Sequence, residues 1–395
     1  MTLYTRFRHI LLVAFLAPAT AFATTSAAEL PLSEVARAAL TRGAATATGA
    51  PPFSASAWLA ALPSLEASYL RSEEPLGTDE SELGLNLPLK SPFLRKQDAR
   101  LRQLAADLAE AEHQRQRLYY SGLVREALWS ASIAERRAGQ TQRKITLLQE
   151  LRERTQALFD ARGASRYALL LVSQELVDAR LEHEDQLALE NRWRERYRAL
   201  TGLGTLPRRI EEAPVTDRQA WQAHPALRLL DLGWEQQQAL IAAGGAHGAP
   251  WNLRLAAKHL ESPAFDDTQY GVSIEVPLGF AGSDTQSSSS EWQAAARAHA
   301  RERDEMQLTL AQSWRQLQLE ARHLQRRQAL LDEAAGISGE LSVEATALGR
   351  LNELGSEIRI KRLIADLDRQ SEAAINQLLI GQNRAMSQQA AGIPL

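Results

Sequence analysis

The sequence predicts a mostly α-helical protein with a small β part, built as an internal duplication. Short segments that alternate polar and apolar residues occur twice, at 81–89 and 270–278, and a long run with helical periodicity follows each of them. The two copies keep the same order of parts along the 395-residue chain. Such self-similarity is typical of a structural plan that is used twice.

Three pairs of corresponding positions support the duplication, at separations of 189, 192 and 190 residues. The separations agree within three residues, although the side chains of the two copies are rarely identical. We therefore expect a first structural repeat at 24–204 and a second at 205–395. The pairs are Pro88 with Pro277, Gly163 with Gly355, and Gly202 with Gly392.

The N-terminus is predicted to be a signal peptide, residues 1–23. Arg6 and Arg8 precede the apolar run 10–17, and Ala21-Phe22-Ala23 supplies a small-x-small cleavage site. The alternative is an N-terminal membrane anchor, but the run is less than half as long as a spanning helix requires. We expect an exported mature protein, with no cysteine to carry a bacterial lipid anchor.

The composition excludes several functions. Without cysteine the chain can have no disulfide, thiol catalysis or zinc–thiolate site. The net charge of −3 argues against general attraction to nucleic acid. The HExxH, P-loop and strand-linked GxGxxG motifs are absent. We expect no enzyme activity, no cofactor, no metal site and no nucleic-acid partner.

Each repeat is predicted to begin with a β-hairpin, at about 64–89 and about 250–279. In the first hairpin Leu83, Leu85, Leu87 and Leu89 alternate with polar residues. A period of two places these leucines on one face of a strand and Glu82, Gly84 and Asn86 on the other. Val272, Ile274, Val276 and Leu278 repeat the pattern in the second hairpin.

A long helix is predicted to follow each hairpin. Ser91 and Pro92 form an N-cap and first-turn pair, and about 70 residues up to Gly163 would make a helix of roughly 100 Å. We expect helices at about 92–203 and at about 291–390. The arm that returns after the first long helix is predicted in two pieces, at about 164–201 and about 225–243. Apolar residues with the 3-4 spacing of a coiled coil support both long helices: Leu101, Leu104, Leu108 and Ala111, then Leu310, Trp314, Leu317, Ala321 and Leu324.

Two side-chain clusters favour structural roles. Glu182-His183-Glu184-Asp185 has metal-ligand residue types, but neighbours on a helix point in different directions, so a solvated face is the preferred interpretation. Leu118-Tyr119-Tyr120 and Trp129 are expected to pack within a helical wall rather than to line a passage.

Four strands of seven to eleven residues present a problem of closure. Their length suits tilted transmembrane strands, but two hairpins cannot close a barrel and lipid tolerates no open sheet edge. Either several copies close one barrel together, or the hairpins pack on helices in a soluble protein. The signal peptide, the helix length and the duplication favour the first alternative.

The whole plan resembles the TolC-like outer-membrane efflux channels of Gram-negative bacteria, over about residues 30–395. The resemblance lies in the order hairpin, long helix, glycine turn, helix, and in Val276-Pro277-Leu278, His224-Pro225 and Thr201-Gly202. The segments 118–137 and 251–279 look most like the branch associated with metal-ion efflux.

The resemblance implies a homotrimer in the outer membrane, with a long periplasmic extension. Each chain would give four strands to a shared transmembrane β-barrel, and its antiparallel helical hairpins would form part of an α-barrel tunnel. The implied function is the passive exit duct of a tripartite efflux or type I secretion system, working with an inner-membrane pump and a periplasmic adaptor protein. The implied adaptor-docking tip comprises Arg162, Gly163, Ala164, Ser165, Leu354, Gly355 and Ser356.

The sequence departs from the family in two places. Family members often carry acids shortly after the tip glycines, whereas Leu169 and Lys361 lie six positions after them here and the nearest acids are Asp366 and Asp368. The first repeat also lacks a clear counterpart of 225–243. The alternative function is a soluble periplasmic coiled-coil adaptor or scaffold, although we find no lipoyl-like β domain; a periplasmic enzyme is a more distant alternative.

Overall fold

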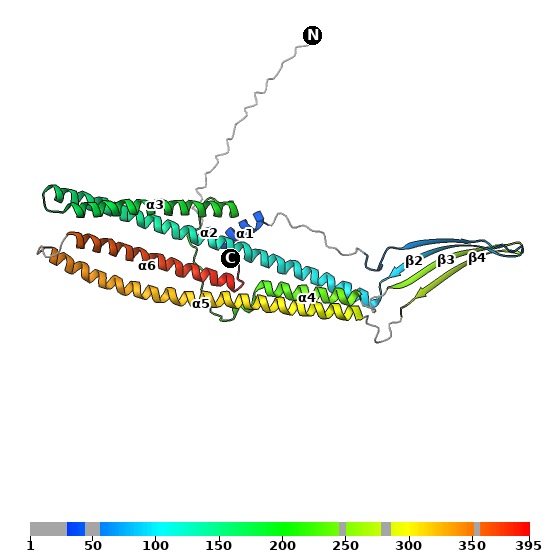
Figure 1. Ribbon diagram of the computed structural model, residues 1–395. Coiled ribbons are helices and arrows are strands. Elements are labelled where there is room, and N and C mark those ends of the chain that lie inside the picture. Colours follow the sequence, from blue (N-terminus) through cyan, green and yellow to red (C-terminus); the bar gives the residue numbers. More distant parts are fainter. Residues whose placement is uncertain (1–29, 44–55, 245–249, 278–285, 351–355) are drawn as a thin grey trace, which may run out of the picture.

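The computed structural model is an elongated layer of helices with a β-sheet projecting from one end (Figure 1). The predicted signal peptide and the tip residues Leu354 and Gly355 lie outside the described residues. None of the described helices is both long enough and apolar enough to cross a bilayer. The described residues are 30–43, 56–244, 250–277, 286–350 and 356–395.

The order helix, two strands, long helix, shorter helix occurs twice along the chain. The elements are α1 (Leu32–Gly43), β1 (Ser64–Leu70), β2 (Asp79–Leu89), α2 (Pro92–Asp160), α3 (Arg166–Thr201), a short 3-10 helix (Ala220–Ala223), α4 (Pro225–Gly244), β3 (Trp251–Ser262), β4 (Phe265–Glu275), α5 (Gln286–Arg350) and α6 (Ser356–Ala390). Two boundaries differ from expectation. The last strand ends at Glu275, before Val276, and the helix expected from about residue 291 begins at Gln286.

The predicted signals at the start of α2 are confirmed. The Ser91 hydroxyl accepts a hydrogen bond from the Leu94 amide (3.2 Å), and Pro92 occupies the first turn, where its missing N–H has no cost. Leu101 and Leu104 are buried as the 3-4 spacing predicted. The resulting helix has 69 residues, and at 1.5 Å per residue it is about 100 Å long.

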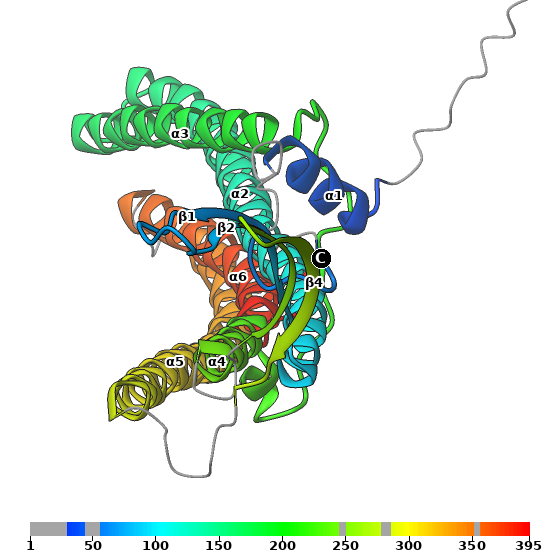
Figure 2. The same cartoon turned by 90° about the vertical axis from the view of Figure 1, so that its right-hand side faces the viewer.

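Seen end-on, the helices form one curved layer with α3 and α5 at its two edges (Figure 2). Helix α2 packs against α3 on one side and against α4 and α6 on the other, and α5 packs against α4 and α6. Helices α4 and α6 therefore lie in line between α2 and α5, with α4 nearer the sheet (Figure 1). The prediction that α4 continues the return arm of α3 was wrong, because the intervening connector carries the chain to the opposite side of α2.

The two hairpins join into one antiparallel sheet in the order β1-β2-β3-β4. The strands β2 and β3 pair along their length, from Asp79 opposite Glu261 to Leu89 opposite Trp251. Strands β1 and β4 are the edges of this sheet within the chain. The sheet extends beyond the helices (Figure 1), so the alternative in which the hairpins pack on helices does not describe this structure.

Buried side chains concentrate at the middle of the helical layer. Val35 and Ala39 of α1 pack with Val124 and Leu128 of α2 and with Tyr197 of α3. Burial raises the pKa of the Tyr197 hydroxyl. This cluster at the middle of the layer attaches α1 to α2 and α3. A second cluster lies toward the far end of the layer and contains Ile145, Leu148, Ala168, Val172, Leu176, Ala179, Ile360 and Ile364.

Candidate functional site

One face of the sheet is apolar and lies open to solvent. Because side chains alternate along a strand, the register brings Leu83 of β2 beside Ala67 of β1 and Ala257 of β3. Leu83 is 51% exposed and Tyr270 is 84% exposed. Apolar surface on this scale marks an interaction site in a soluble or membrane-bound protein. This apolar face comprises Leu65, Ala67, Tyr69, Leu83, Leu85, Leu87, Leu89, Trp251, Leu253, Leu255, Ala257, Tyr270, Val272 and Ile274.

The other face of the sheet is polar and carries a network of charges. Arg254 of β3 contacts Glu82 of β2 (Nη2 to Oε1, 2.7 Å) and Glu66 of β1 (Nη1 to Oε2, 3.1 Å). Lys258 contacts Glu80 through Nζ at 2.6 Å. The predicted separation of Leu83, Leu85, Leu87 and Leu89 from Glu82, Gly84 and Asn86 is therefore confirmed by the register.

The turn between α2 and α3 ends α2 by a Schellman motif. The Gly163 amide donates to the Leu158 carbonyl (2.7 Å) and the Arg162 amide donates to the Phe159 carbonyl (2.9 Å). Arg162 has φ 60°, the left-handed conformation that glycine usually supplies at this position. A Cβ on Gly163 would lie 3.5 Å from the nearest atom, an ordinary contact. Arg162, and not Gly163, therefore occupies the sterically restricted position of this turn.

The remaining tip residues lie at the ends of the adjoining helices. The Ser165 hydroxyl accepts a hydrogen bond from the Ala168 amide (3.1 Å) and so caps α3, while Ala164 is half-buried beside it. Ser356 is the first residue of α6. Their predicted counterparts Leu354 and Gly355 lie outside the described residues.

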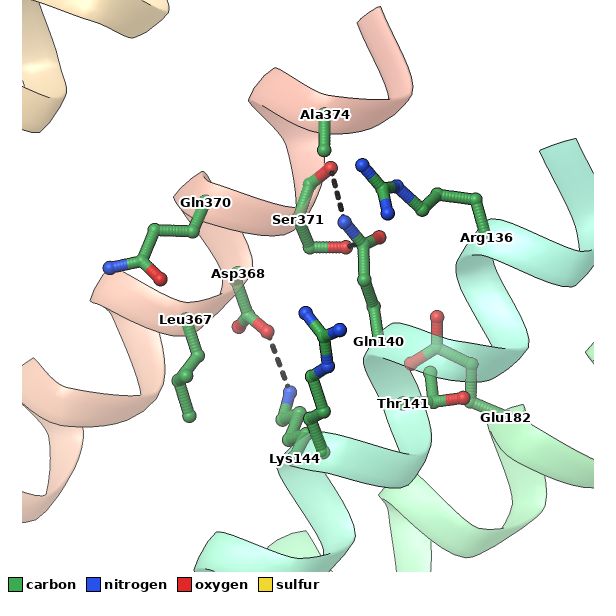
Figure 3. Close-up of a pocket in the computed structure, with 11 residues that line it drawn as sticks. Arg136, Gln140, Thr141, Lys144, Glu182, Leu367, Asp368, Gln370, Ser371 and Ala374 are labelled. Carbon is green, nitrogen blue, oxygen red and sulfur yellow. Dashed lines mark hydrogen bonds and ion pairs between the residues drawn. The ribbon is translucent and has the colours of Figure 1, made fainter. Parts of the chain in front are cut away.

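A polar seam joins the two helical hairpins between α2 and α6 (Figure 3). Lys144 Nζ lies 2.8 Å from Asp368 Oδ1, and Gln140 exchanges hydrogen bonds with Ser371. These groups border a cavity of about 240 Å³ that Glu182 of α3 also lines. The sequence identified Asp368 only as one of the acids nearest the tip and did not predict its ion pair. Its partner is 224 residues away, so no local signal could have identified the pair.

A buried arginine at the middle of the helical layer joins α2, the 202–224 connector and α6. Arg125 of α2 is 1% exposed, and its guanidinium binds both carboxylate oxygens of Glu212 (Nε to Oε1, 2.9 Å; Nη2 to Oε2, 2.6 Å). Its Nη1 donates to Gln389 Oε1 of α6 (2.7 Å). Bidentate pairing satisfies the buried charge. Sequence reasoning missed this cluster, which fastens the 202–224 connector to the helical layer.

His224 shapes the start of α4 beside this connector. Its Nδ1 accepts a hydrogen bond from the Ala226 amide (3.2 Å). Burial lowers the pKa of the His224 imidazole, so the neutral form, which can accept that bond, is favoured.

The two edges of the helical layer expose apolar side chains. Leu308, Leu319, Leu330 and Leu341 of α5 follow one another at intervals of 11 residues and are all exposed. Eleven residues make three helical turns, so these leucines form a stripe along the helix. At the opposite edge α3 exposes Tyr167, Leu170, Val177 and Leu181.

The other predicted clusters have structural contacts. His183 Nδ1 lies 3.1 Å from the Ala138 carbonyl and from the Thr141 hydroxyl of α2. Within the described part of the chain, no group of three or more potential ligands is placed to hold a metal ion. Trp129 is buried against Gly381 of α6 and Leu118 is buried too, in agreement with the predicted packing role, whereas Tyr119 is exposed and does not fit it.

Comparison with solved structures identifies the fold. CusC, whose structures describe folding and transmembrane channel formation, superposes with a TM-score of 0.62 at 13% identity, covering 84% of this chain and 83% of CusC. The outer-membrane protein VceC of Vibrio cholerae gives 0.62 at 13%, covering 84% and 86%. The MtrE outer-membrane channel of Neisseria gonorrhoeae gives 0.59 at 15%, covering 84% and 81%. No protein-family model and no curated protein sequence matches the chain.

The chain thus has the fold of outer-membrane channel proteins, as the sequence resemblance predicted. The structural likeness, at identities of 13–15%, shows the fold alone and does not single out the metal-efflux branch. Membership of that branch stays a prediction.

Proposed function

We propose that this protein is an outer-membrane channel, the passive exit duct of a tripartite efflux or type I secretion system. The observation that carries the proposal is the open sheet with an exposed apolar face, joined to a helical layer about 100 Å long. Lipid on the apolar face would remove its side chains from water. The fold shared with outer-membrane channels supports the same function.

Closure of the sheet requires further copies of the chain. Strands β1 and β4 are edges in one chain, and unpaired backbone groups of an edge cannot remain in lipid. Pairing β4 of one copy with β1 of the next would satisfy both edges. Three copies would form one β-barrel, in agreement with the homotrimer that the family resemblance implies.

The helical edges support the same arrangement. The leucine stripe of α5 and the apolar stripe of α3 are different surfaces, so a contact between α5 of one copy and α3 of the next is heterologous. Such contacts generate a ring when the rotation from copy to copy closes. In such a ring the curved layers would enclose an α-barrel tunnel in the periplasm. The exposed stripes would then be buried between neighbouring copies.

The end of the helical layer away from the sheet is the proposed periplasmic entrance. It carries Arg162, Gly163, Ala164 and Ser165, with Ser356 at the start of α6. Exposed Leu158 and Tyr167 beside the turn offer apolar contacts to another protein. We assign adaptor docking to this tip, with Leu354 and Gly355, and an inner-membrane pump as the source of energy.

The internal duplication remains part of the proposal, with repeats at 24–204 and 205–395. Gly202 (φ 75°) and Gly392 (φ 77°) each follow a helix in the left-handed conformation, at positions that the sequence paired. The helix that precedes the hairpin is shorter in the first repeat, since α1 has 12 residues and α4 has 20.

Fractionation and reconstitution test the function. We expect the protein in the outer membrane, released by detergent as an oligomer, and we expect discrete conductance steps after insertion into a planar bilayer. Recovery as a soluble periplasmic monomer without conductance would contradict the channel and favour the adaptor or scaffold alternative.

A further inference from the structure

Arg254 of β3 lies on the polar face of the sheet, where a glycine on the neighbouring strand leaves space for its side chain. Its side chain passes over Gly84 of β2, and a Cβ on Gly84 would lie 3.2 Å from Arg254 Nη2 and 3.3 Å from Nε. Gly84 is buried, whereas the residues beside it on β2 are not. The absence of a side chain at Gly84 allows the guanidinium to cross β2 and bind Glu82 and Glu66 at once.

The polar face carries more carboxylates than cations. Along the four described strands it has five carboxylates and two cations, a surplus of three negative charges per chain. Asp267 accepts a hydrogen bond from Gln269 Nε2 (2.9 Å), and Glu275 accepts one from Asn252 Nδ2 (3.3 Å). These neutral donors leave both charges in place. The charged residues of the face are Glu66, Glu80, Glu82, Arg254, Lys258, Asp267 and Glu275.

We propose that the passage enclosed by the sheet favours cationic solutes, and that Arg254 determines how strong this preference is. The inference rests on the proposed function, in which the polar face lines the lumen. A surplus of carboxylates raises the local concentration of cations and lowers that of anions. Arg254 reduces this surplus of negative charge at its own position, where it forms ion pairs with Glu66 and Glu82.

The effect depends on ionic strength. Between surface charges and a solute in a wide lumen, screening acts over about 10 Å at 0.1 M salt and about 30 Å at 0.01 M. The preference for cations is therefore strongest in dilute salt and decreases as salt is added.

Reversal potentials in planar bilayers test the proposal, with KCl at 10 mM on one side and 100 mM on the other. Arg254→Gln increases the surplus, and we expect the potassium-to-chloride permeability ratio to rise roughly two- to fivefold. Glu66→Gln with Glu82→Gln decreases the surplus, and the ratio should fall below that of the unmodified channel. Arg254→Lys keeps the charge and should leave the ratio nearly unchanged.

Glu261→Gln is the matched control, because Glu261 lies on β3 with its side chain on the opposite face. It should not change the ratio. Unchanged ratios for both the Arg254→Gln and the double glutamine channels, at normal conductance, would overturn the assignment of Arg254. Absence of conductance from the unmodified protein would instead overturn the proposed channel function, and with it this inference.

Discussion

Arg125 is the residue at which three separate segments of the chain meet. Replacing Glu212 by Gln removes the negative partner of a guanidinium that is 1% exposed. Breaking one side of a buried ion pair costs about 3–5 kcal/mol, so we expect a clearly lower midpoint of thermal unfolding by circular dichroism. The double replacement of Arg125 by Met and Glu212 by Leu should recover part of the loss, because no buried charge remains. Equal midpoints for the single variant and the unmodified protein would contradict the role of the pair.

Gly381 is required by the close approach of Trp129. A Cβ at this position would lie 2.2 Å from the indole ring, so Gly381→Ala should destabilise the protein by about 1–3 kcal/mol through overpacking. Gly139→Ala is the control, since no atom lies within 4 Å of its added Cβ. That change should be neutral or stabilising by up to about 1 kcal/mol. Thermal unfolding of both variants separates the outcomes, and a stable Gly381→Ala protein would refute the contact.

Arg162 has the backbone conformation for which glycine is best suited. Left-handed backbone costs an ordinary residue about 1 kcal/mol, so Arg162→Gly should strengthen the tip turn and slow hydrogen exchange of the backbone amides at positions 162 and 163. Gly163→Ala should leave this exchange nearly unchanged, because its Cβ has space. Faster exchange in the Arg162→Gly protein would show that the arginine side chain, rather than its φ, decides the turn.

At the scale of elements, the Lys144–Asp368 ion pair is a weak part of the contact between α2 and α6, which also includes buried apolar side chains. Asp368 is 53% exposed, and solvent screening reduces such a pair to about 1 kcal/mol or less. We therefore expect Lys144→Gln to lower thermal stability by no more than about 1 kcal/mol. If the proposed channel opens by moving α6 away from α2, the same change should increase the fraction of time for which it conducts. Arg154→Gln is the control, because Arg154 pairs with Glu150 within α2 and bridges no helices. Identical open fractions for both variants would argue against opening along this seam.

At the scale of the whole molecule, the exposed leucine stripe of α5 is the surface that a ring of copies would bury. Leu319→Glu combined with Leu330→Glu places two charges in that proposed contact, and burying an unpaired charge costs several kcal/mol. We expect the detergent-solubilised protein to change from oligomer to monomer, measured as mass by light scattering. Gln325→Glu adds a charge at an exposed position of the same helix and should leave the oligomer intact. An intact oligomer in the double leucine variant would place the contact elsewhere.

The sequence by itself determined the elements and the amphipathic nature of the strands. Ser91 and Pro92 mark the start of α2, and the alternating leucines from Leu83 to Leu89 define one face of β2. These features depend on residues a few positions apart, where periodicity and capping chemistry act directly. The turn between α2 and α3 was predicted for the same reason, whereas the left-handed conformation of Arg162 was not.

Only the tertiary structure decided how the elements meet. The pairing of β2 with β3, the position of α4 in line with α6, and the contacts of Arg125, Lys144 and Arg254 all join segments far apart in the chain. The Arg254–Glu82 contact spans 172 residues, and the Arg125–Gln389 contact spans 264. Each depends on packing of the complete layer, because a long polar side chain has no partner until the fold brings one within hydrogen-bonding distance.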